Sequence, residues 1–254
     1  MKRLPVLISI PHGGTSIPIE LEDRVTISAK DIFEDADTAA AQIFDLGEDA
    51  VEVVPSKIAR MFVDVNRQAD DRPPENPDGV IKSLRCDGAA VYKEGCDPDR
   101  PLIAALLDRY YYPYHLQIGE AIQNPELKLA LDCHTMAVKG LAISNSPGQK
   151  RPMICIGNAY GKTCDPTLLG WFSNCLSDAF KIPESQISLN KPFGGGYIVR
   201  TYGHDPVPWI EIHLNRILYM KEPWYDDKEM YIEEERILEL RQCLSTALRD
   251  LLGQ

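Results

Sequence analysis

Runs of apolar residues that end at a polar cluster recur along the chain and predict the strands of a sheet. Several of these runs, such as residues 129–131 before Asp132, contain no polar position that would mark an exposed face. Apolar runs of this kind are typical of strands that are covered on both faces. We therefore expect strands at residues 5–10, 50–55, 59–65, 129–135, 153–157, 197–202 and 209–213.

Helical segments separate several of these strands. We expect helices at residues 31–44, 102–123, 165–180 and 229–252. Pro113 should kink or interrupt the second helix, because proline lacks the N–H that a helix interior needs. The segment 66–101 is rich in Asp, Pro and Gly, and a connection of that length is usually functional, so we expect it to lie over a site. No linker interrupts the pattern, which predicts one α/β domain over residues 1–254.

Composition and charge narrow the possible partners. The chain has 254 residues, 44% of them hydrophobic, and a formal net charge of −11. Such an acidic protein is a poor match for nucleic acid or an anionic membrane, and no apolar run approaches the ~20 residues of a membrane span. The seven cysteines include no CxxC pair, which indicates free thiols. We expect a cytoplasmic protein that binds a small molecule, with its oligomeric state left open.

Polar residues at the ends of the predicted strands could form one site. Asp132 and His134 lie two positions apart, so both would project from one face of their strand. His12 follows the first strand, and ligands of open α/β sheets bind at the carboxyl ends of strands. Two histidines and a carboxylate can hold zinc in a hydrolase, although a generic polar cleft is the simpler alternative. Cys133 next to His134 suggests a thiol nucleophile, but strand neighbours point to opposite faces, which disfavours it.

Three further residues suit the hydrolysis of a carboxylate-bearing substrate. Glu211, on the last predicted strand, could accept a proton from water as a general base. Arg67 follows Asn66 at a strand end, and its planar guanidinium suits bidentate binding of a carboxylate. Arg200 is a second candidate cation, with a surface arginine as the simpler alternative. These residues point to a metal-assisted hydrolysis of an anionic compound.

Seven separated motifs occur in an order that resembles a known family. They are Pro11-His12-Gly13-Gly14, Asp35-Ala36-Asp37, Asp64-Val65-Asn66-Arg67, Pro113-Tyr114-His115, Asp132-Cys133-His134-Thr135, the turn 190–197 that ends in Tyr197, and the stretch 211–216 that begins with Glu211. The family is that of the N-formylglutamate amidohydrolases. Two departures occur within the motifs: Thr135 stands where the family has serine, and Lys191 is inserted into the Asn-Pro pair of the turn.

The family is similar in turn to the zinc carboxypeptidases and aspartoacylases. This resemblance implies a mixed, mostly parallel central sheet flanked by helices, a zinc ion (Zn2+), and a glutamate base that acts on a water at the metal. It assigns the metal to His12, His134 and an acid. Thr15 stands where carboxypeptidases carry their third ligand, so we prefer Asp37 for that role, with Asp35 as the alternative.

The resemblance also implies the remaining roles. It makes Glu211 the base and an Asn-Arg pair the holder of the substrate carboxylate. Candidate substrate-binding residues are Asn66, Arg67, Arg200 and Tyr197. We therefore expect a zinc-dependent amidohydrolase that cleaves an N-acyl, N-formyl-like amide of an acidic amino acid or a similar carboxylate.

Two other functions fit the same scaffold. One is a metallocarboxypeptidase that acts on a peptide or a cell-wall fragment, which an open cleft would favour. The other is a binding protein that has lost turnover. A protein of the second kind would have lost one of His12, His134 and Glu211, and the chain keeps all three.

Overall fold

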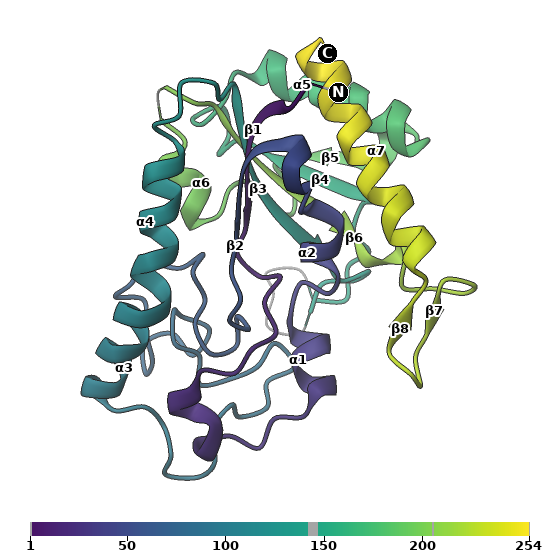
Figure 1. Ribbon diagram of the computed structural model, residues 1–254. Helices are drawn as coiled ribbons and strands as arrows, with labels where there is room; N and C mark the ends of the chain where they lie inside the picture. The colour runs from purple at the N-terminus through teal and green to yellow at the C-terminus, as the bar shows by residue number, and fades with distance from the viewer. Residues whose placement is uncertain (1, 142–146, 205, 254) are drawn as a thin grey trace.

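A six-stranded sheet lies between two layers of helices (Figure 1). The computed structural model describes residues 2–141, 147–204 and 206–253. The strand order is β2-β1-β3-β6-β4-β5, and only the β4–β6 pair is antiparallel within this described sheet. The prediction of a mixed, mostly parallel sheet flanked by helices is confirmed. The strands are β1 (Leu4–Ile10), β2 (Ala50–Pro55), β3 (Leu129–Met136), β4 (Ile154–Gly157), β5 (Ile187–Leu189) and β6 (Trp209–Asn215).

The helices differ in length and several are short. They are α1 (Ala29–Asp35), α2 (Ala40–Phe44), α3 (Arg100–Leu106), α4 (Tyr112–Ala121), α5 (Pro166–Phe180), α6 (Tyr197–Tyr202) and α7 (Glu234–Leu252). Short 3-10 turns occupy Ile19–Arg24, Gly47–Asp49, Glu184–Gln186 and Arg216–Leu218, and a π-helical turn occupies Leu107–Tyr111. A small hairpin pairs β7 (Tyr225–Asp226) with β8 (Tyr231–Ile232).

Each face of the sheet is covered by its own apolar cluster, which is why the central strands read as continuous apolar runs. All seven residues of β1 are buried. Leu4, Val6, Ile8 and Ile10 pack with residues of α2, α5 and α7. Leu7 belongs to the opposite cluster, with residues of α3, α4 and α6. Figure 1 shows α4 on one side of the sheet and α2 and α7 on the other. This double burial holds the strand ends firmly in place.

Two predicted strands are wrong. Residues 59–65 form turns, in which Phe62 N–H donates to Ala59 O at 3.0 Å, and their apolar side chains pack in the α4-side cluster. Residues 197–202 form α6, in which Arg200 N–H donates to Gly196 O at 3.2 Å. Both segments are apolar because they are buried, and a short apolar run does not distinguish a buried turn or helix from a buried strand.

Two predicted helices have different bounds. The helix expected at 31–44 is divided into α1 and α2, because the chain turns at 36–39 and Ala39 takes a left-handed conformation (φ 60°). This turn carries Asp37 towards the sheet. The helix expected at 229–252 begins only at Glu234, since the preceding residues form β8.

The helix expected at 102–123 is interrupted near Pro113, as predicted. Its interruption is the π-helical turn, which directly precedes Pro113. Two side chains of this region hold the chain that leads to the cavity: Tyr111 Oη donates to Arg67 O at 2.7 Å, and His115 Nε2 lies 2.9 Å from Val65 O. Burial lowers the pKa of His115 to about 4, so this histidine is neutral and structural.

No helix in the described part of the chain is long and apolar enough to cross a bilayer. The expected cytoplasmic location and the single-domain assignment stay predictions. The segment 66–99 contains no helix or named strand in the structure, and six of its residues, including Asp78 and Lys82, line a cavity.

Candidate metal and catalytic site

A cavity of about 480 Å³ opens beside the carboxyl ends of β1 and β3. That volume lies in the range of small-molecule sites, about 300–1,000 Å³. Polar residues that follow several of the strands come together at this cavity. Predicted site residues that line the cavity are His12, Asp37, Asn66, Arg67, His134 and Glu211.

The three candidate metal ligands converge on one point. His12 follows β1, and Asp37 N–H donates to His12 O at 3.1 Å, which brings the 36–39 turn to the strand end. Asp37 Oδ2 lies 2.9 Å from His134 Nδ1 and 3.6 Å from His12 Nδ1. One ligand atom of each residue lies within 4.8 Å of the other two. Asp37 therefore stands between the two imidazoles.

The second nitrogen of each imidazole is held by another carboxylate. His12 Nε2 lies 2.7 Å from Asp64 Oδ1, and His134 Nε2 lies 3.2 Å from Asp132 Oδ2. Asp132 is itself held, since Ser9 Oγ donates to its Oδ1 at 3.0 Å. Carboxylates in this position fix the orientation of metal-binding histidines and leave the other nitrogen facing the metal.

The donor set fits zinc. Zinc bonds of about 2.0–2.2 Å in tetrahedral geometry put ligand atoms about 3.3–3.6 Å apart. Asp37 Oδ2 lies 3.6 Å from His12 Nδ1, within that range, and 2.9 Å from His134 Nδ1, which is shorter. His12 Nδ1 is buried and has no hydrogen-bond partner in the structure, although it faces Asp37 and His134. A buried polar atom without a partner is costly. A cation between these three residues would give it one.

Asp37 is better placed than Asp35, the alternative acid. Asp35 is the last residue of α1, and its Oδ1 accepts a hydrogen bond from Cys86 N at 2.8 Å. Both carboxylates are buried, but only Asp37 contacts His12 and His134. Asp35 instead ties α1 to the loop over the cavity.

Electrostatics keep Asp37 ionised. Burial opposes its ionisation, but the nearby His12 and His134 outweigh burial and hold the pKa of Asp37 well below its ordinary value. Burial similarly works against a charged His134, yet Asp132 and Asp37 raise its pKa well above the ordinary value. The negative charge of Asp37 and Asp132 therefore favours a positive charge at His134, either a proton or a bound cation.

Glu211 lies next to this group on β6. Strands β3 and β6 are parallel and place Asp132 opposite Glu211 and His134 opposite His213. Gly196 N–H donates to Glu211 Oε1 at 2.9 Å, whereas the buried Oε2 has no hydrogen-bond partner among the residues that the structure describes. Burial would raise the pKa of Glu211, but His213, His134 and Gly196 outweigh burial and lower it. One oxygen of an ionised carboxylate is therefore fixed and the other is available for a proton.

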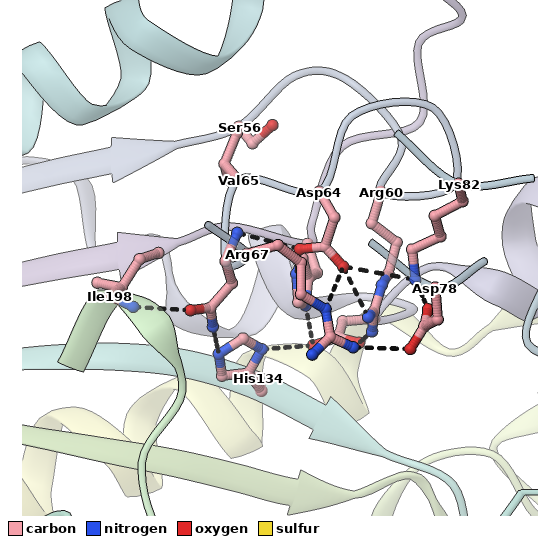
Figure 2. A network of polar contacts seen from close by, with 12 residues as sticks. Ser56, Arg60, Asp64, Val65, Arg67, Asp78, Lys82, His134 and Ile198 are labelled. Carbon is pink, nitrogen blue, oxygen red and sulfur yellow. Dashed lines mark hydrogen bonds and ion pairs between the residues drawn. The ribbon is translucent and has the colours of Figure 1, made fainter. Parts of the chain in front are cut away.

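A network of cations and carboxylates forms one wall of the cavity (Figure 2). Arg60 Nη2 lies 2.9 Å from Asp64 Oδ2 and Lys82 Nζ lies 3.4 Å from the same atom. Arg67 Nη2 donates to Asp78 Oδ2 at 2.7 Å, and Lys82 also contacts Asp78. Arg60 and Lys82 were not among the predicted site residues, because neither lies in a motif and both belong to irregular segments.

Asn66 connects the histidines to α6. Its Nδ2 donates to Asp132 Oδ2 at 3.0 Å and lies 3.1 Å from His134 Nε2, while its Oδ1 accepts a hydrogen bond from Ile198 N at 2.8 Å. The amide is thus engaged on both sides, as Figure 2 shows for Ile198 and His134. A Cβ on Gly196 would lie within 3.0 Å of both Asn66 and Glu211, so this close approach requires glycine.

The opposite wall of the cavity is aromatic and basic. The ring of His213 stacks on His134 with centroids 4.7 Å apart, and Phe193 stacks on His213 at 3.9 Å. The guanidinium of Arg151 lies over Phe193, 5.0 Å from its centroid. Arg151 was absent from our candidates, because it lies in a polar connection with no motif. Arg216, at the end of the last motif, also lines this wall.

Two predicted substrate-binding residues lie outside the cavity lining. Arg200 is exposed on α6. Tyr197 is half-buried at the start of α6, with its ring centroid 5.7 Å from that of His115. Both were placed on a strand in the sequence analysis, and the helix turns them towards α4 and the surface instead of the metal ligands.

Comparison with known proteins identifies the family of this chain. The model of the N-formylglutamate amidohydrolase family matches residues 4–220. An N-formylglutamate deformylase of Pseudomonas putida is 26% identical over 98% of this chain and 91% of the relative. That of Pseudomonas aeruginosa is 26% identical over 87% of this chain and 84% of the relative.

Solved structures show the same fold. The N-formylglutamate amidohydrolase of Ralstonia eutropha JMP134 superposes with a TM-score of 0.77 at 19% identity, over 100% of this chain and 94% of that one. A gene product of Agrobacterium tumefaciens gives a TM-score of 0.68 at 16% identity, over 99% and 92% of the two chains. The family match spans most of the chain and includes every motif named above. The chain belongs to the N-formylglutamate amidohydrolase family and is a hydrolase that acts on an amide.

Proposed function

We propose that this protein is a zinc-dependent amidohydrolase that removes an N-acyl group, formyl or similar, from an acidic amino acid. One observation carries the proposal: His12, Asp37 and His134 converge beside a buried Glu211 whose Oε2 has no partner. Each element of a metal-assisted hydrolase is therefore present in one cavity. The names of the two Pseudomonas relatives support an N-formyl amide as the bond that is cleaved.

The chain's own residues divide the chemistry between them. Zinc held by His12, Asp37 and His134 would lower the pKa of a water and polarise the acyl oxygen. Glu211 would accept a proton from that water at Oε2, while the Gly196 N–H keeps Oε1 in place. The same carboxyl group could then donate the proton to the departing amine. Asp64 and Asp132 hold the two imidazoles in orientation throughout.

Arg67 would hold the substrate carboxylate next to the scissile amide. Its Nε lies 3.9 Å from Asp64 Oδ2, and Asp64 contacts His12, so Arg67 is one residue removed from the metal ligands. Asp78 holds its Nη2 and thereby fixes the plane of the guanidinium. The protein is acidic overall, so an anionic substrate is captured only by local cations of this kind.

The test is an assay of the zinc-loaded protein on a panel of N-acyl amino acids. N-formyl-L-glutamate should be hydrolysed, and its analogue with an α-carboxamide should be a much poorer substrate. Release of formate and of the free amino acid would be measured together with zinc content. Hydrolysis of none of the panel by protein with full zinc occupancy would contradict the proposal.

Arg67→Lys should erode the preference for the α-carboxylate over the α-carboxamide by about tenfold. Lysine keeps the charge but loses the two parallel donors, which are worth roughly 1–2 kcal/mol at a site of this kind. The ratio of kcat/KM for the two substrates measures this preference. An equal loss for both substrates would mean that Arg67 has a structural or catalytic role and does not read the carboxylate.

A further inference from the structure

The basic side chains that line the cavity differ in whether they form ion pairs with carboxylates of the protein. Arg60 contacts Asp64 and Asp37, Lys82 contacts Asp64 and Asp78, and Arg67 contacts Asp78. The wall they share therefore compensates its own charge. Arg67 has the most exposed side chain of the three, so a substrate carboxylate that binds this wall would share its guanidinium with Asp78.

Arg151 has no carboxylate partner of this kind among the described residues, and its buried Nε has no hydrogen-bond partner among them. Arg216 on the same wall does have partners, because its guanidinium donates to Thr135 Oγ1, to Glu34 O and to Ala36 O. Burial and the nearby charge of Arg216 both lower the pKa of Arg151. An anion beside Arg151 would relieve both effects.

The structure positions Arg151 firmly. Its N–H donates to Val138 O at 3.1 Å, and its carbonyl oxygen accepts from Asn215 Nδ2, at the end of β6, at 3.4 Å. Its guanidinium lies over Phe193. The hydrogen bonds hold the backbone of Arg151 and the ring contact orients its guanidinium, so the side chain loses little freedom when it binds a carboxylate.

Arg151 is separated from the proposed metal ligands by more side chains than Arg67 is. The rings of His213 and Phe193 stand between it and His134, whereas Arg67 is separated from His12 only by Asp64. An N-acylated acidic amino acid carries one carboxylate next to the scissile amide and another at the end of its side chain. Two separate arginines thus line the cavity that would hold the two carboxylates.

We propose that Arg151, stacked on Phe193, binds the side-chain carboxylate of the substrate and makes the enzyme selective for N-acyl dicarboxylic amino acids. This inference rests on the proposed function and adds a residue that determines its specificity. Arg67 and Arg151 then read different carboxylates of one molecule, from opposite walls of the cavity.

Three substrates and two variants separate these roles. The substrates are N-formyl-L-glutamate, N-formyl-L-glutamine and the α-amide of N-formyl-L-glutamate. Arg151→Gln should lower kcat/KM for N-formyl-L-glutamate by about 10- to 100-fold, the loss expected for charge-assisted hydrogen bonds. It should change kcat/KM for N-formyl-L-glutamine by less than about threefold, because the amide does not need the cation. Arg151→Lys should restore part of the selectivity.

The controls use the same three substrates. Arg67→Lys should alter the discrimination against the α-amide and leave that between glutamate and glutamine compounds. Arg100→Gln, an exposed arginine at the start of α3, should change neither ratio. If Arg151→Gln slows both side-chain forms equally, or neither, Arg151 does not read the side-chain carboxylate.

A binding measurement distinguishes failure of this inference from failure of the proposed function. Calorimetric titration of the zinc-loaded protein with L-glutamate and L-glutamine requires no turnover. Wild type should bind L-glutamate more tightly, and Arg151→Gln should remove that difference. If no N-formyl compound is hydrolysed, the proposed function fails, and this titration still decides the role of Arg151. Equal binding of the two amino acids by wild type would overturn the inference.

Discussion

Asp37→Ala is expected to abolish metal binding, whereas Asp35→Ala should leave the metal content unchanged. The two aspartates are two residues apart and equally buried, so they form a matched pair. Only Asp37 contacts both histidines. Because the metal supplies several kcal/mol of transition-state stabilisation, Asp37→Ala should lower kcat/KM by ~10³-fold or more. Elemental analysis of the purified variants gives the zinc per chain, and the amidohydrolase assay gives the rate.

His134→Ala extends the same test, since it removes a ligand that comes from β3. It should also purify without metal. The expected assignment is wrong if His134→Ala retains full zinc occupancy, or if Asp35→Ala loses the metal and Asp37→Ala keeps it. Thermal unfolding of each variant separates loss of a ligand from loss of the fold.

Glu211→Gln should lower kcat by at least ~10²-fold and leave the zinc content at the wild-type level. Glutamine keeps the shape of the side chain and can still accept the Gly196 N–H hydrogen bond. It cannot accept a proton at the position of Oε2, and a positioned base contributes about 10²–10⁴-fold. The combination of full metal occupancy and low turnover is the diagnostic result. Near-normal turnover would mean that another residue activates the water.

The site residues that could be predicted from the sequence lie on, or just after, strands with long apolar runs. β3 and β6 are buried over their full lengths, so their periodicity and the face shared by Asp132 and His134 could be read directly. His12 was predictable for the same reason, because it directly follows β1. The metal ligands are thus positioned by the most regular part of the fold.

The site residues that were not predicted lie in segments whose burial does not indicate their secondary structure. Residues 59–65 are as apolar as a strand but pack as turns, so Arg60 was not seen to face Asp64. Lys82 and Arg151 lie in long polar connections, and their placement depends on tertiary contacts such as that between Arg151 and Phe193. Periodicity carries no information about such contacts.

The π-helical turn at Leu107–Tyr111 determines where this helix can change in length. A π turn holds one residue more than an ordinary helical turn. Removing the exposed Asp108 would let the helix close into regular geometry while α3 and α4 keep the faces they now bury. Removing a residue from within α4 would instead rotate everything before it by about 100°, carrying the buried Leu106 towards solvent. Loss of one residue is therefore better tolerated at this turn, which also supports the Arg67 carbonyl, than within α4.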